Sequence, residues 1–101
     1  MDLNTASLAD FSPWVNSEFR VATESGQMMA LELVEATPLT ASPNRPGRQP
    51  FSLIFRGPKN RPLDQRIHDL EHDRLGRLGL FLVPIGPGAD GNGPYYQAIF
   101  N

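Results

Sequence analysis

Residues 78–100 read LGLFLVPIGPGADGNGPYYQAIF, and this stretch decides the fold class. Its first part, Leu78–Ile85, is apolar almost throughout and contains Pro84 near its end, which is typical of a buried strand. Residues 86–94 concentrate glycine and proline around an Asn-Gly step, which favours a hairpin loop. Tyr95–Phe100 then reads as a second strand. The stretch therefore predicts two strands joined by a hairpin.

Three more strands are predicted upstream of this hairpin. Phe51–Arg56 (FSLIFR) alternates large apolar residues on one face, and Glu18–Thr23 and Met28–Ala36 show the same period of two. Ten prolines and nine glycines in 101 residues leave little room for long helices. Residues 63–73 fit either a strand or a helix, because Leu and His residues recur at both spacings.

One short helix is predicted within residues 5–16, where Ser7 can act as its N-cap. Leu8, Phe11 and Trp14 would share one side of this helix and pack onto the sheet. We therefore predict a mostly β fold, residues 1–101 as one domain: a small antiparallel barrel or two-sheet sandwich of five or six strands with a short N-terminal helix. Residues 38–50 (PLTASPNRPGRQP) are predicted to form an exposed loop.

The strand pattern also predicts where the aromatic rings lie. We expect four phenylalanines to alternate as core residues, namely Phe51, Phe55, Phe81 and Phe100. Apart from these core rings, only Trp14, Tyr95 and Tyr96 could be exposed, and Trp14 is expected to cover the core from the helix.

Charge is distributed unevenly along the chain. Residues 1–44 hold six acids and one base, whereas residues 45–77 hold eight bases and four acids, and the formal net charge is −2. Arginine is enriched at protein-binding hot spots. We therefore predict a partner-binding surface in the basic middle third of the chain, formed by Arg45, Arg48, Arg56, Lys59 and Arg61.

Few residues carry recognisable chemistry. Without cysteine, the chain has no thiolate nucleophile or zinc ligand. His68–His72 (HDLEH) matches the H-x-x-E-H pattern of zinc peptidases, but no third ligand is evident downstream. On a strand the two histidines would lie about 13 Å apart, too far for one metal. No serine lies in G-x-S-x-G. We expect no enzyme activity, no catalytic or metal site, and no cofactor.

The cellular location and the partners of the protein are predicted from features that the sequence lacks. The N-terminal residues lack the basic and apolar regions of a secretory signal, and cysteine is missing, so we expect a cytoplasmic protein. The longest apolar run, Leu80–Pro84, is far short of the ~20 residues that span a bilayer, so no membrane partner is expected. A pI of about 5.5 argues against nucleic acid. The oligomeric state is left open: a terminal strand and hydrophobic strand edges would allow edge-to-edge pairing into a homodimer.

Three segments carry a family resemblance: FSLIFRGP (51–58), IHDLEHDRLGRLGLFLVPIGP (67–87) and YYQAIFN (95–101). They resemble an uncharacterised bacterial family of small β proteins, a domain of unknown function with no assigned activity. In that pattern His72 takes the family's histidine position, whereas His68 stands where tyrosine is usual. The resemblance implies a strand at residues 66–72. Members are often encoded beside proteins with a phage tail-collar domain, which implies a structural or assembly partner.

We therefore expect a non-enzymatic protein-interaction or assembly accessory module, linked through the resemblance to a phage-tail-like or secreted fibre system. One alternative is a β-barrel that binds a small ligand or nucleic acid. A second alternative is a metal-dependent hydrolase with a site assembled from His72, Asp69 and Glu71.

Overall fold

The fold is described from a computed structural model of the chain, in which residues 2–23, 25–40, 49–59, 61–87 and 93–101 are placed. The elements, in chain order, are α1 (Leu8–Phe11), the 3-10 helix η1 (Ser12–Trp14), β1 (Glu18–Ala22), β2 (Met28–Pro38), β3 (Phe51–Arg56), β4 (Arg66–His72), β5 (Gly76–Gly86) and β6 (Tyr95–Phe100). The predicted mostly β class with one short N-terminal helix is confirmed. No helix among the placed residues has the length and apolar character to cross a membrane.

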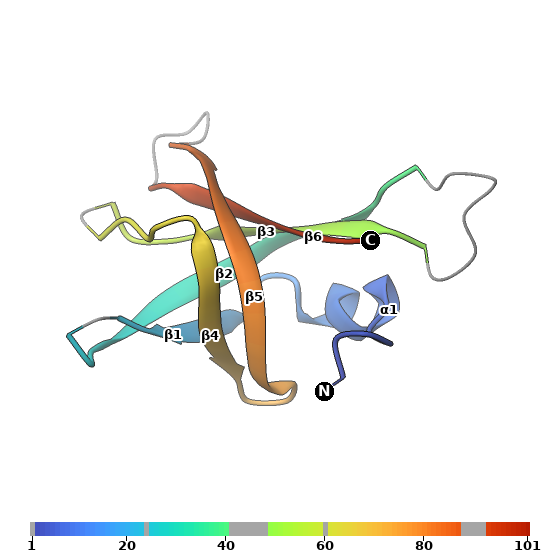
Figure 1. Ribbon diagram of the computed structural model, residues 1–101, viewed down its shortest axis with the longest axis horizontal. Helices are drawn as coiled ribbons and strands as arrows, with labels where there is room; N and C mark the ends of the chain where they lie inside the picture. The colour runs from blue at the N-terminus through green and yellow to red at the C-terminus, as the bar shows by residue number, and fades with distance from the viewer. Residues whose placement is uncertain (1, 24, 41–48, 60, 88–92) are drawn as a thin grey trace.

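The six strands close into one barrel in the order β1-β2-β3-β6-β5-β4, and every neighbouring pair is antiparallel (Figure 1). The barrel consists of two three-stranded meanders, β1–β3 and β4–β6. Because β3 and β4 are not neighbours, residues 57–65 must cross one end of the barrel to join the meanders. We call these residues the connector. This closure decides for a barrel and against a sandwich.

Residues 66–72, which fitted both periods, form a strand. β4 pairs with β5 along its whole length, from Arg66↔Leu82 to His72↔Gly76. At β2 the strand runs two residues beyond the predicted Ala36 and ends at Pro38, which pairs with Phe51. Proline is tolerated there because a strand end loses little when one N–H donor is missing. Most of the predicted loop 38–50 lies outside the placed residues.

One end of the barrel is plugged by α1. Phe11 is fully buried, and its ring lies 5.8 Å from that of Phe51 and 5.5 Å from that of Phe100. Phe51 and Phe100 stack on each other across β3 and β6, with ring centroids 4.5 Å apart. The C-terminus and α1 accordingly lie at the same end in Figure 1. The predicted packing of the helix on the sheet thus centres on Phe11.

The connector crosses the opposite end, and a buried tyrosine holds it in place. The backbone N–H of Leu63 donates to the hydroxyl of Tyr96 over 2.8 Å, and Tyr96 is fully buried. Gly57 begins the connector directly over this ring: a Cβ there would lie 3.1 Å from Tyr96 and 3.0 Å from Leu31. The prediction that Tyr96 could be exposed is therefore wrong, because its hydroxyl has a partner inside the fold.

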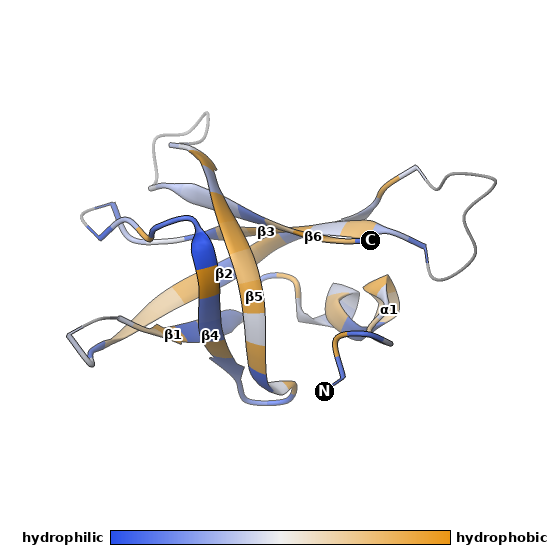
Figure 2. Cartoon of the chain, viewed as in Figure 1, coloured by the Kyte–Doolittle hydropathy of each residue, from blue (hydrophilic) through white to orange (hydrophobic). Residues whose placement is uncertain are grey.

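A second aromatic prediction is also wrong. Phe81 was expected in the core, but half of its surface (50%) is exposed on the outside of β5. Leu78, Leu80 and Leu82 take the inward positions of this strand instead. β5 is hydrophobic along most of its length (Figure 2), and Phe81 and Ile85 are exposed while its leucines are buried. A period-two pattern cannot choose the inner face of such a strand.

Replacing Phe11 with alanine should lower the free energy of unfolding by about 3–5 kcal/mol, because it empties the aromatic plug. Phe81→Ala is the matched control, since it removes the same atoms from an exposed site and should change stability by about 1 kcal/mol or less. Urea denaturation of both variants measures the difference. Equal losses would contradict the assignment of Phe11 to the plug and Phe81 to the surface.

Candidate functional site

The bases of the predicted partner-binding surface that are placed have different surroundings. Arg45 and Arg48 lie outside them. Arg56 forms a half-buried ion pair with Glu32 across β3 and β2. On the connector, Lys59 borders a proline-rich hollow, while the guanidinium of Arg61 donates to the side chain of Gln27 in a different hollow. The partner-binding role of these bases stays a prediction.

The two histidines of the H-x-x-E-H match have separate surroundings at opposite ends of β4. His68 donates its Nε2–H to the backbone carbonyl of Asp64 over 2.7 Å, which fastens the connector to β4. His72 lies between two aromatic side chains, with ring centroids 4.4 Å from Phe19 and 5.3 Å from Trp14. No group of three or more His, Asp or Glu residues among those placed could hold a metal ion.

His72 also contacts a serine, and the direction of the hydrogen bonds decides what this pair can do. Nδ1 of His72 accepts the backbone N–H groups of Arg74 (3.1 Å) and Leu75 (3.2 Å), so the ring proton sits on Nε2. Nε2–H therefore donates to Oγ of Ser17 over 2.9 Å. Oγ of Ser17 in turn donates to the carbonyl of Trp14 over 2.5 Å.

A nucleophilic serine needs the opposite arrangement, in which the imidazole accepts the hydroxyl proton. In this protein both hydrogen bonds of the pair instead hold neighbouring segments together. The Ser17–His72 contact ties the segment between η1 and β1 to the β4–β5 turn, and it closes the α1 end of the barrel on one side.

Burial favours the neutral form of His72 and lowers its pKa below the ordinary value of 6.5. The carboxylate of Asp73 opposes this shift, and the guanidinium of Arg20 adds to it. The hydrogen bonds act in the same direction, because a proton on Nδ1 would face two N–H donors. Protonation of His72 is therefore linked to unfolding.

We expect the barrel to lose stability as the pH falls below 6.5. The folded-state pKa of His72 lies below its unfolded-state value, so its contribution is complete above pH 6.5 and disappears as the pH falls through the folded-state pKa. Urea denaturation between pH 8 and pH 5 measures this slope. His72→Gln should flatten it, whereas the control His68→Gln should retain it. An unchanged slope in His72→Gln would contradict the linkage.

The outer surface of β4 and β5 combines exposed apolar side chains with charged ones. Three successive cross-strand pairs face outward there, namely Ile67↔Phe81, Asp69↔Gly79 and Glu71↔Arg77. We call these six residues the β4–β5 outer face. Ile67 is 64% exposed and Phe81 is 50% exposed, so a large apolar pair lies in water at one end of the face. Charged side chains occupy the other end.

Gly79 leaves a notch in the middle of this face. A Cβ at this position would make ordinary contacts, 3.6 Å to Cγ2 of Ile67 and 3.9 Å to Oδ1 of Asp69. Neither space nor a positive φ requires glycine here. The notch continues to Met28 on β2 as a hollow of about 430 Å³. Glycine inside a strand costs about 0.5–1 kcal/mol against alanine and often marks a close approach by another chain or a ligand.

Sequence reasoning missed this face because it placed Phe81 in the core. One signal was present: Gly79 interrupts an otherwise continuous apolar run with a residue that strands disfavour.

The family comparison supports the whole barrel as one unit. The profile of the family described as Domain of unknown function (DUF6916) matches residues 6–100. The chain belongs to this family. The match spans α1 and all six strands of this DUF6916 domain, from the N-terminal plug to β6. The expectation of an uncharacterised family is thereby confirmed. No curated protein and no solved structure matches the chain.

Proposed function

We propose that this DUF6916 chain is a non-enzymatic accessory module that docks onto a protein partner through the β4–β5 outer face. The observation that supports this most is the pair Ile67–Phe81 beside the open notch at Gly79. Burying apolar surface at an interface contributes roughly 25 cal/mol per Å². An aromatic anchor next to a notch is the arrangement from which binding hot spots are built.

The charges on the same face favour a particular kind of partner surface. Asp69 and Glu71 are acidic and Arg77 is basic, so the face carries an excess of negative charge beside its apolar pair. The partner should present an apolar side chain to the notch and basic side chains to Asp69 and Glu71.

The Ser17–His72 contact supports the non-enzymatic part of this proposal. This serine–histidine pair has its protons directed for structure and not for nucleophilic attack. The family resemblance suggests the first partner to test, a protein with a tail-collar domain, and with it a role in assembling a phage-tail-like or secreted fibre. A homodimer would have to form through a surface other than a strand edge, because the barrel is closed.

Calorimetric titration with a tail-collar-domain protein tests the face directly. Phe81→Ser should weaken binding by about thirtyfold, the effect of losing a hot-spot anchor worth ~2 kcal/mol. Ile99→Ser is the matched control, because Ile99 is also about half exposed but lies on β6, and it should bind as the wild type does.

Gly79→Thr supplies a second, opposite signature. Threonine should raise the free energy of unfolding by about 0.5–1 kcal/mol, because glycine weakens a strand, and it should also weaken binding by filling the notch. Higher stability together with lower affinity separates a binding role from a structural one. Wild-type affinity in both Phe81→Ser and Gly79→Thr would contradict docking at this face, and no binding at all would contradict the choice of partner.

A further inference from the structure

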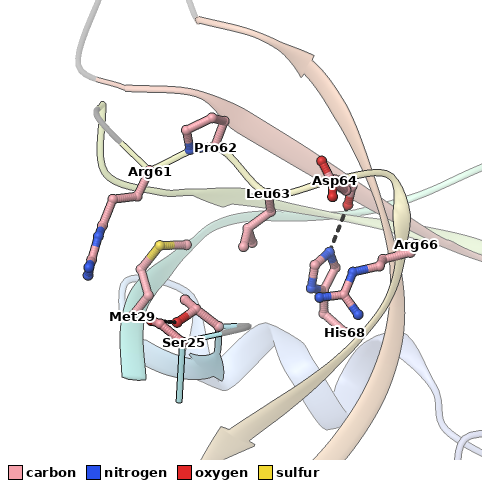
Figure 3. Close-up of a pocket in the computed structure, with 9 residues that line it drawn as sticks. Ser25, Met29, Arg61, Pro62, Leu63, Asp64, Arg66 and His68 are labelled. Atoms are coloured by element: carbon pink, nitrogen blue, oxygen red, sulfur yellow. Dashed lines mark hydrogen bonds between the residues drawn. The ribbon is translucent and has the colours of Figure 1, made fainter. Parts of the chain in front are cut away.

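The barrel end opposite α1 contains a hollow of about 290 Å³, which we call the barrel mouth. Three segments line it: the β1–β2 turn with Thr23 and Ser25, the connector at residues 61–64, and the start of β4 with Arg66 and His68. Figure 3 shows these side chains around the opening. This hollow is separate from the β4–β5 outer face and shares no residue with it.

Hydrogen bonds hold the wall of the mouth before any ligand arrives. His68 is 2% exposed and is fixed by its bond to the carbonyl of Asp64. Arg61 spans from the connector to Gln27 in the β1–β2 turn. In the same turn, the hydroxyl of Thr23 lies 3.0 Å from Oγ of Ser25 and donates to the carbonyl of Gln27 over 2.9 Å. A site held in this way loses little entropy on binding.

The charges of the mouth favour an anion. Arg61 and Arg66 contribute two guanidinium groups, and Asp64 contributes one carboxylate. The ion pairs among the placed residues are Arg20–Asp73 and Arg56–Glu32, so Asp64 forms an ion pair with neither arginine of the mouth, and the lining keeps an excess of one positive charge. In Figure 3 the side chain of Arg66 extends across the opening toward His68, while that of Arg61 points to the other side.

The floor of the mouth is apolar. Met29 and Leu63 are both buried core residues whose side chains line the hollow. A guanidinium group beside a hydrophobic floor suits a ligand with one charged head and one apolar body. The volume of about 290 Å³ lies just below the range of ordinary ligand sites, about 300–1,000 Å³. Both features favour a small molecule over a macromolecule.

We propose that the barrel mouth binds a small molecule with a single phosphate or carboxylate group, whose oxygens contact Arg66 and whose apolar body rests on Met29 and Leu63. The planar guanidinium matches both oxyanions, because each offers two oxygens to its parallel N–H groups. Arg61 contributes a second positive charge at the rim. The site does not depend on the docking proposed for the outer face.

Amide chemical shifts of the intact, isotope-labelled chain test this site, with phenyl phosphate, benzoate and inorganic phosphate as probes. Saturable shifts should concentrate at residues 23–29 and 61–68. Phenyl phosphate should bind more tightly than inorganic phosphate, because its ring covers the apolar floor. The ratio of phenyl phosphate to benzoate affinity then identifies which oxyanion the mouth prefers.

Arg66→Gln should weaken binding of the preferred probe by about tenfold or more, because it removes the charge and keeps a polar side chain. Arg77→Gln is the matched control, since it removes an arginine from the outer face and should leave binding unchanged. Phe81→Ser should also leave it unchanged, so failure of the docking proposal and failure of this one are distinguishable.

Three results would overturn the proposal. One is the absence of saturable shifts at residues 23–29 and 61–68. The second is an equal loss of affinity in Arg66→Gln and Arg77→Gln, which would indicate attraction to positive charge in general. The third is tighter, salt-sensitive binding of a single-stranded oligonucleotide at the same amides, which would assign the mouth to nucleic acid.

Discussion

The barrel depends on the crossing of one of its ends by the connector. Because β3 and β4 are not neighbours, residues 57–65 leave the sheet, and their backbone groups need partners outside the strand ladders. Gly57 donates to the carbonyl of Pro94, Leu63 donates to the hydroxyl of Tyr96, and Asp64 accepts from His68. These three contacts link the connector to β4, to β6 and to the residue that precedes β6.

The same crossing creates the barrel mouth. The connector carries Arg61 and Asp64 to the rim, and its bond to His68 sets where β4 begins and hence where Arg66 projects. His68, which belongs to the H-x-x-E-H match, therefore stabilises the wall of the mouth. The other histidine, His72, has an equivalent structural role at the α1 end, where it joins Ser17 to the β4–β5 turn.

The outer face has a different physical origin. In a barrel each strand has one buried side, and β5 meets that need with Leu78, Leu80 and Leu82. Phe81 is then outside, opposite Ile67, although nothing in the core requires apolar residues there. Gly79 likewise occupies a position where a larger residue would fit. Residues that the fold does not need are the ones that favour a role in binding.

Five of the six strands were predictable from the sequence, because alternating apolar residues and glycine–proline turns are local signals. It placed β3 and β6 at their observed bounds, and it located the short helix around Phe11. For residues 66–72 the family resemblance implied a strand, and the pairing of β4 with β5 confirms it. The closed barrel and the opposite positions of Tyr96 and Phe81 emerged only with the tertiary structure. Tyr96 is buried with its hydroxyl bonded to the distant Leu63, whereas Phe81 is exposed because three leucines of its own strand take the inward positions. The mouth and the outer face could not be predicted from local sequence patterns, because each joins residues from separate segments of the chain.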